Sequence, residues 1–193
     1  MNYLAHSYFS PPDPDILCGN LIADMLKGNE RKTIATQFTP GLRLHYFIDS
    51  FTDRHEGLKV VKRQLRTDFG KYAPVVADVY MDFILATAWD SISSVSYQMH
   101  TAYVYTCLQA GLDLLPAAIQ PRLMHMVQSD WLSIYLYPQS LERIFTNLRK
   151  RASHPQLLHN GLEIYERDNE IYLPVFLLFF RDLQQAVMLY QNQ

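Results

Sequence analysis

Residues 74–89 read PVVADVYMDFILATAW, and this stretch indicates both the fold class and a possible site. At about 100° per residue, Asp78 and Asp82 fall on the same arc of a helix as Val79 and Leu85. The helix therefore carries two carboxylates inside its apolar stripe. Because an unpaired buried carboxylate is costly, the pattern requires an arginine, several hydrogen-bond donors or a metal ion nearby. A buried ion pair or a contact with a helix end would explain it without a function.

The rest of the chain repeats this helical spacing, with apolar residues three and four positions apart between Pro, Gly and Ser/Thr punctuation. Strand patterns are scarce, so we predict an all-α fold, a single-domain helical bundle over residues 1–193. We expect a division or a kink at Pro174, because proline lacks the N–H that a helix interior needs. The predicted helices cover residues 2–9, 15–26, 41–53, 57–69, 74–89, 94–111, 116–128, 138–151 and 156–191.

The composition narrows the class of protein. The chain has 193 residues, of which 49% are hydrophobic, and this share excludes a disordered chain. Its formal net charge is −2, so the chain has no overall positive charge that would attract nucleic acid. The most apolar run, 172–180, has nine residues against the roughly 20 that span a bilayer, so no membrane span is expected. Only two cysteines, Cys18 and Cys107, occur, and the start of the chain lacks a signal-peptide pattern, so we expect a cytoplasmic protein.

A second polar pattern occupies residues 41–55, GLRLHYFIDSFTDRH. His45, Asp49 and Asp53 follow i, i+4, i+8 spacing and form one ladder along a helix. A His and an Asp one turn apart can hold one cation, and facing helices that each donate ligands build metal sites in bundle cores. Imidazole with several carboxylates favours Mn²⁺, Fe²⁺ or Mg²⁺. A solvated polar helix face would show the same ladder.

Further candidates gather in the same half of the chain. Asn20 and Asp24 form another i, i+4 polar pair on an apolar helix, and His6 lies near the start. Alone, each could be a cap, a bridge between helices or a satisfied core residue. Because they occur together with the other candidates in the first half of the chain, a shared site is favoured. Its candidate residues are His6, Asp24, His45, Asp49, Asp53, His55, Asp78 and Asp82, whereas His100, His125, His154 and His159 are predicted to be structural.

These residues belong to an ordered set of motifs: MNYLAH ending at His6, GNLIAD from Gly19 to Asp24, Lys27-Gly28, the 41–55 ladder, and Asp78, Asp82 and Trp89. With this set the chain resembles the acyl carrier protein phosphodiesterases over nearly its whole length. The resemblance implies a distant relationship to HD-type metal phosphohydrolases, although no adjacent His-Asp pair occurs here. The family commonly has histidine after the second carboxylate of the 74–89 helix, where this chain has Phe83.

The resemblance implies an enzyme that hydrolyses the phosphodiester between 4′-phosphopantetheine and a serine of holo-acyl carrier protein. The expected metal is Mn²⁺, with Mg²⁺ or Fe²⁺ as alternatives, because a divalent ion polarises phosphoryl groups and lowers the pKa of bound water. The implied metal ligands are His45, Asp49 and Asp78, with Asp24 and Asp82 completing or orienting the set. The implied catalytic group is His6, His55 and Asp53, in which the histidines protonate the departing serine oxygen or contact phosphate.

A basic strip suggests where an acidic protein substrate could dock. Lys59, Lys62, Arg63 and Arg66 share one face of a predicted helix. Carrier proteins are acidic, so we expect this strip to bind the partner. An ordinary solvated helix face would have the same residues.

Two other functions fit the sequence. One is a metal phosphohydrolase that acts on a nucleotide or another small phosphoester through the same residues. The other is a non-catalytic helical module that binds a carrier protein, in which Phe83 marks the loss of the chemistry.

Overall fold

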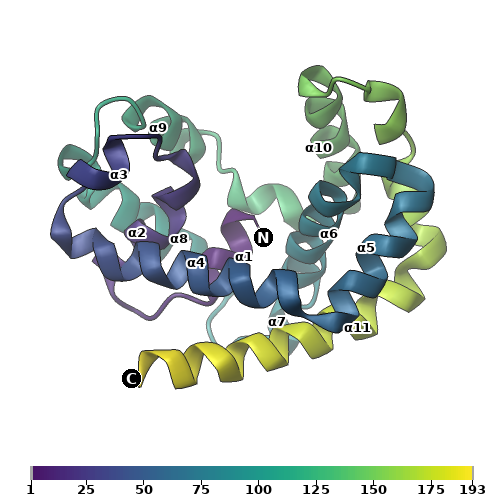
Figure 1. The fold of residues 1–193 in the computed structure, drawn as a ribbon, viewed down its shortest axis with the longest axis horizontal. Helices are drawn as coiled ribbons and strands as arrows, with labels where there is room; N and C mark the ends of the chain where they lie inside the picture. Colours follow the sequence, from purple (N-terminus) through teal and green to yellow (C-terminus); the bar gives the residue numbers. More distant parts are fainter. Residues whose placement is uncertain (1, 193) are drawn as a thin grey trace. The chain divides into compact units, whose positions relative to one another are not determined.

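The structure is a computed structural model and describes residues 2–192. Every regular element in this part of the chain is an α-helix or a 3₁₀-helix (η), which confirms the all-α prediction (Figure 1). The residues group into two compact units. The N-terminal unit contains Tyr3–Ser50 and Trp89–Ser133, and the C-terminal unit contains residue 2, Phe51–Ala88 and residues 134–192. This grouping does not decide the single-domain prediction, which stays a prediction.

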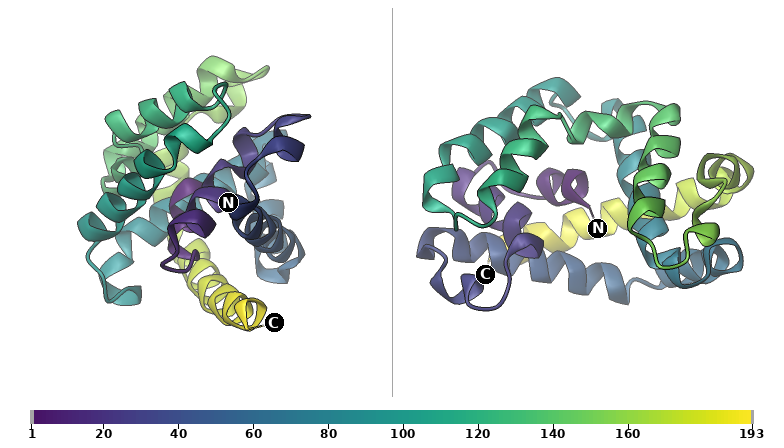
Figure 2. Two further views of the ribbon diagram at one scale, coloured as in Figure 1. Left: turned by 90° about the vertical axis from the view of Figure 1, so that its left-hand side faces the viewer. Right: turned by 90° about the horizontal axis from the view of Figure 1, so that it is seen from above.

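The N-terminal unit is built on α1, α2, α8 and the first part of α4. Helix α2 packs against α1 and α8, and α8 packs against α9 (Figure 2). The C-terminal residues of α4, 51–54, belong to the other unit. The elements of the N-terminal unit are α1 (Tyr3–Tyr8), α2 (Pro14–Ile22), η1 (Ala23–Met25), α3 (Glu30–Thr33), η2 (Thr36–Phe38), α4 (Thr39–Arg54), α7 (Trp89–Ile92), α8 (Tyr97–Ala110), η4 (Leu112–Leu114) and α9 (Gln120–Gln128).

Two glycines allow α2 and α4 to approach closely. A Cβ added to Gly19 would collide with the carbonyl oxygen of Phe38, and one added to Gly41 would collide with that of Ile16. The same Cβ on Gly41 would lie 2.7 Å from the backbone nitrogen of Asn20. Since the obstacles are backbone atoms, they cannot move aside without shifting a helix. The glycines therefore bring the chain around Asn20 against the start of α4.

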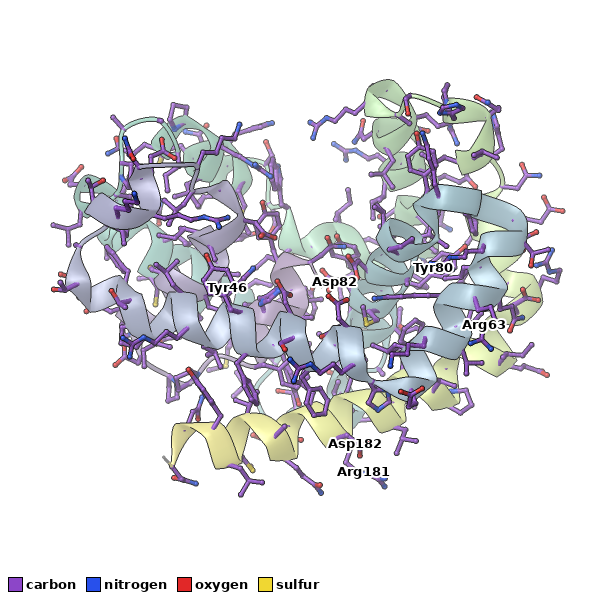
Figure 3. All side chains as sticks on the ribbon, in the orientation of Figure 1. Tyr46, Arg63, Tyr80, Asp82, Arg181 and Asp182 are labelled. Atoms are coloured by element: carbon purple, nitrogen blue, oxygen red, sulfur yellow. The ribbon has the colours of Figure 1, made fainter. Side chains whose placement is uncertain are left out.

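In the C-terminal unit α5 packs against α6 and α11, and α10 packs against α11. Glycine is required at position 161, because an added Cβ would collide with the ring of Phe145. The hydroxyl of Tyr80, labelled in Figure 3, donates to the carbonyl oxygen of Gly161 at 2.6 Å and ties α6 to the start of α11. The elements of this unit are α5 (Glu56–Phe69), η3 (Gly70–Tyr72), α6 (Ala73–Thr87), α10 (Pro138–Arg151), η6 (Pro155–Leu158) and α11 (Gly161–Gln191), while η5 (Leu132–Leu136) crosses the boundary between the units.

The last helix differs from its prediction. Helix α11 begins at Gly161 rather than at residue 156, and it continues through Pro174 without dividing into two helices. Pro174 is exposed, so the carbonyl group that loses its partner there can be hydrated. Tyr172 and Phe176 on either side are fully buried and hold the helix in place.

Helix α11 has 31 residues and is the one helix within residues 2–192 that is long and apolar enough to cross a membrane, by length and composition alone. The nine-residue apolar run 172–180, from which no membrane span was expected, is only part of this helix. Core helices of globular proteins share both properties. One face of α11 is buried, with Tyr172, Phe176, Phe179 and Leu183 in the core.

Candidate metal centre

Three predicted site residues meet in the N-terminal unit: His6 from α1, and His45 and Asp49 from α4. The Nε2 atom of His6 lies 3.2 Å from Oδ1 of Asp49, and Nε2 of His45 lies 3.1 Å from Oδ2 of the same carboxylate. One ligand atom from each residue lies within 4.8 Å of the other two. Asp49 thus has one imidazole at each of its oxygens, and the three ligand atoms are close enough to share a single cation.

Asn20 of α2 orients both imidazoles. Its backbone carbonyl oxygen is 2.9 Å from Nδ1 of His45, and its side-chain oxygen is 2.8 Å from Nδ1 of His6. The amide orientation follows from the Asn20 Nδ2 group, which donates to the carbonyl oxygen of His6 and to Ser10 Oγ, both at 2.9 Å. Since both oxygens of Asn20 only accept, each Nδ1 carries its proton. The Nε2 atom of each histidine therefore faces Asp49.

This arrangement leaves His6 without a hydrogen bond at Nε2. The atom is fully enclosed and has no hydrogen-bond partner, although Asp49 Oδ1 is near. The ring stacks on that of His45, with the centroids 4.1 Å apart and an angle of 14° between the planes. An imidazole lone pair beside a carboxylate is unfavourable in isolation, and a cation between them removes the repulsion. The residues therefore fit a divalent metal ion.

The pKa values describe the charge of the metal-free centre. Burial lowers the pKa of His6 to about 4, so its ring is neutral at pH 7. Burial also acts to lower the pKa of His45, but hydrogen bonds and charge from Asp24 and Asp49 outweigh it and raise this pKa to about 9. Burial would raise the pKa of Asp49, yet the hydrogen bond from protonated His45 holds it far below its usual range. The proton on His45 is the charge that a metal ion would replace.

Asp24 lies at the outer side of the cluster, in η1. Its Oδ1 atom is 3.2 Å from Nε2 of His45, and this hydrogen bond lowers the pKa of the carboxyl group. The side chain of Asp24 is 66% exposed and that of Asp49 is 36% exposed, whereas His6 and His45 are both 3% exposed. The histidines form the inner wall and the carboxylates face solvent, so a ligand can reach the centre from the carboxylate side.

Two members of the predicted catalytic group lie in the C-terminal unit. Asp53 is exposed at the end of α4 and forms an ion pair with Lys62 at 3.2 Å. His55 precedes α5, and its Nε2 atom is 3.4 Å from Oδ2 of Asp182 in α11. Its ring meets that of Phe179 edge-on at 5.1 Å, and its buried Nδ1 has no hydrogen bond. Figure 3 labels Asp182 on α11.

Asp78 and Asp82 also belong to the C-terminal unit, on α6. Asp82, labelled in Figure 3, is fully buried, and Asp78 is partly exposed. The predicted burial of a carboxylate on the apolar face of this helix is therefore correct for Asp82. Phe83 is 3% exposed and packs edge-on against Tyr165 at 5.0 Å, so it is a core residue of this unit.

The predicted docking strip is only partly available for a partner. Lys59 pairs with Glu56 at 2.7 Å, and Lys62, with a side chain only 18% exposed, pairs with Asp53. Arg63, labelled in Figure 3, and Arg66 are exposed on α5.

The sequence does not indicate that Asn20 orients the two histidines or that Asp182 contacts His55. Asn20 was recognised only as half of a polar pair, although an amide in a helix between Gly19 and a run of apolar residues is a signal for a buried hydrogen-bonding role. The contact of Asp182 with His55 spans 127 positions, and nothing local in the sequence indicates it.

Comparisons with known proteins agree with these motifs. Residues 1–183 match the family described as "Acyl carrier protein phosphodiesterase". The chain is 30% identical over 140 residues to a protein of that name from Pectobacterium atrosepticum, covering 72% of this chain and 67% of the relative. It is 30% identical over 165 residues to one from Escherichia coli O139:H28, covering 83% and 84%, and 23% identical over 181 residues to one from Yersinia pestis, covering 93% and 94%. No solved structure matches the chain. The chain therefore belongs to the acyl carrier protein phosphodiesterase family.

Proposed function

We propose that the protein is a metal-dependent phosphodiesterase that removes 4′-phosphopantetheine from the serine of holo-acyl carrier protein and leaves the apo form. The proposal rests on one observation above the others. The Nε2 atoms of His6 and His45 converge on the Asp49 carboxylate while Asn20 holds both Nδ1 atoms. Three relatives named acyl carrier protein phosphodiesterase supply the substrate class.

His6, His45, Asp49 and Asp24 would hold the metal ion. Mn²⁺ is our first choice and Mg²⁺ or Fe²⁺ the alternatives, because the donors are imidazole nitrogens and carboxylate oxygens without a thiolate. Such an ion, when bound, polarises a phosphoryl group and lowers the pKa of a bound water molecule.

The surroundings of His6 favour a different role from the proton donor that the resemblance implies. A histidine with a pKa of about 4 and with Nδ1 engaged by Asn20 is a poor proton donor at pH 7 but a good ligand. We therefore propose His6 as a metal ligand rather than as the acid that protonates serine. Asp53, His55, Asp78 and Asp82 stay candidates through the family resemblance. The cytoplasm stays the proposed location, since Cys18 and Cys107 are both free thiols.

Intact-mass analysis of holo-acyl carrier protein tests the proposal. Incubation with the protein and Mn²⁺ should remove the mass of phosphopantetheine, and a chelator should prevent it. His45→Ala and Asp49→Asn should abolish turnover, whereas Asp113→Asn, an exposed carboxylate elsewhere in the N-terminal unit, should not.

The two alternatives give different outcomes. Hydrolysis of small phosphoesters with an unchanged carrier protein would establish the small-substrate enzyme. Carrier-protein binding without turnover under any of the three metals would establish the non-catalytic module.

A further inference from the structure

An arginine on the segment that joins Asp24 to α4 contacts an aromatic ring that neighbours the candidate metal centre. Arg31 belongs to α3, and its guanidinium carbon lies 5.9 Å from the centroid of the Tyr46 ring. Tyr46 also contacts the centre itself. Its ring meets the His45 ring edge-on, with the centroids 5.7 Å apart and an angle of 87° between the planes. One aromatic ring thus connects Arg31 with a proposed metal ligand. Figure 3 labels Tyr46 on α4.

Two contacts hold the guanidinium group in place. The Nε–H of Arg31 donates to the carbonyl oxygen of Leu26 at 3.1 Å, and the guanidinium carbon lies over the ring of Tyr46, which is 45% exposed. A cation–π contact and one backbone hydrogen bond restrict an otherwise flexible side chain. Arg31 is therefore oriented before any ligand arrives.

The terminal nitrogens of Arg31 are left available. Within residues 2–192 they make no hydrogen bond or ion pair, although Asp24 lies only a few positions away in the chain. Asp24 directs its Oδ1 atom to His45 instead. A guanidinium with a free pair of N–H groups binds a phosphate through two parallel hydrogen bonds.

The expected ligand suits such a group. The side chains of Asp24 and Asp49 are 66% and 36% exposed, so the centre is open to a ligand on the carboxylate side. A phosphodiester carries two non-bridging oxygens, so an oxygen that an ion at the centre does not hold is available to a separate donor. Arg31 is a cation on this segment whose position is fixed and whose donors are unused.

We propose that Arg31 binds the phosphate group of the substrate, with Tyr46 and the Leu26 carbonyl as its positioning groups. The ligand class is a phosphate ester, and the inference rests on the proposed function for the identity of that ester. Lys32 supplies a matched control. It is the neighbouring exposed cation on the same short helix, and within residues 2–192 its side chain makes no hydrogen bond or cation–π contact with Tyr46 or Leu26.

The first experiment measures binding of 4′-phosphopantetheine to the Mn²⁺-loaded protein by calorimetry. Arg31→Ala should weaken binding by about 10–100-fold, since a charge-assisted bidentate contact is lost. Arg31→Lys keeps the charge without the paired donors and should recover only a small part of the loss. Tyr46→Leu should give an intermediate loss, and Lys32→Ala should change the affinity by less than about 3-fold, as an exposed charge does. Melting curves check that each variant is folded.

The second experiment measures the release of the prosthetic group from holo-acyl carrier protein. Arg31→Ala should raise KM more than it lowers kcat, and Lys32→Ala should leave both close to the wild-type values. Equal effects of Arg31→Ala and Lys32→Ala on phosphopantetheine binding would overturn the inference, as would full recovery in Arg31→Lys or no binding by the wild-type protein.

The two arms separate this inference from the proposed function. Binding of phosphopantetheine that depends on Arg31, with no release of the prosthetic group, would retain the phosphate site and reject the proposed activity. Release of the prosthetic group with no special effect of Arg31→Ala would retain the activity and reject the phosphate site.

Discussion

Asn20 and His45 are joined by a hydrogen bond of 2.9 Å, in which Nδ1 of His45 donates to the backbone carbonyl oxygen of Asn20. A backbone oxygen cannot change its role, so Nε2 of His45 is the only nitrogen left for a metal ion. The side chain of the same asparagine imposes this condition on His6. One residue without a charge therefore determines how two proposed ligands face the centre.

Replacement of Asn20 should weaken metal binding without removing a ligand. In Asn20→Ala, His6 loses the acceptor for its Nδ1 proton, and we expect the Mn²⁺ affinity to fall by about 10–100-fold, as for other residues that orient ligands. Calorimetric titration with Mn²⁺ measures it. Ser10→Ala is the control, because Ser10 touches Asn20 but neither ring nitrogen. An unchanged affinity in Asn20→Ala would show that the rings are oriented by other contacts.

Asp78 is a predicted ligand on α6, and its contribution can be measured directly. If it binds the metal, Asp78→Asn should reduce the Mn²⁺ affinity by as much as Asp49→Asn does, and by more than the about 10–100-fold of an orienting residue. Asp113→Asn controls for the general loss of a surface charge. Full affinity in Asp78→Asn would confine the ligand set to His6, His45, Asp49 and Asp24.

The close approach of α2 and α4 makes Gly41 sensitive to the smallest side chain. A change from Gly to Ala inside a helix ordinarily stabilises by about 0.5–1 kcal/mol. In Gly41→Ala the added methyl group meets backbone of α2, so we expect a loss of about 1–3 kcal/mol in the free energy of unfolding and weaker Mn²⁺ binding. Urea denaturation measures the first quantity.

Gly57 is the matched control for this change. Its added Cβ would lie 3.0–3.3 Å from side-chain atoms of Val175 and His55, which can move aside. Gly57→Ala should therefore cost less, and equal losses at the two positions would refute the argument from backbone contact.

His100 should make the stability of the fold depend on pH. Burial lowers its pKa to about 4 from the ordinary 6.5, and its Nε2 atom donates to Ser7 Oγ, whose own proton goes to the Leu4 carbonyl. Between about pH 6.5 and pH 4 the unfolded chain binds a proton that the folded chain does not. The free energy of unfolding should therefore fall as the pH falls through this window, by up to about 3 kcal/mol from this group.

Urea denaturation at pH 7.5 and pH 5 checks the sign. His100→Gln keeps a donor for Ser7 but cannot titrate, so it should reduce the pH dependence. His6 adds to the same effect in the metal-free protein, since its pKa is also lowered to about 4. If the free energy of unfolding depends on pH as strongly in His100→Gln as in the wild type, His100 is not the source of this dependence.

The sequence predicted the helices where the apolar pattern was strong and the ends were marked. The predicted helix 138–151 has the same bounds as α10, which starts at Pro138. The helix predicted to begin at residue 116 begins at Gln120, because residues 116–119 form turns that the helical spacing does not distinguish. The predicted division at Pro174 does not occur, since the burial of its neighbours outweighs the lost hydrogen bond, while the alternative, a kink, stays a prediction.

The sequence by itself determined the all-α class, and i, i+4 spacing grouped His45 with Asp49 and Asn20 with Asp24, because helical spacing fixes which residues share a face. It also indicated His6 through the motif at the start of the chain. Only the tertiary structure decided that the Asn20 carbonyl reaches His45, that His55 faces Asp182, and that Arg31 rests on Tyr46. Contacts between helices depend on where glycines and buried side chains let the helices approach, and periodicity within one helix has no information about that distance.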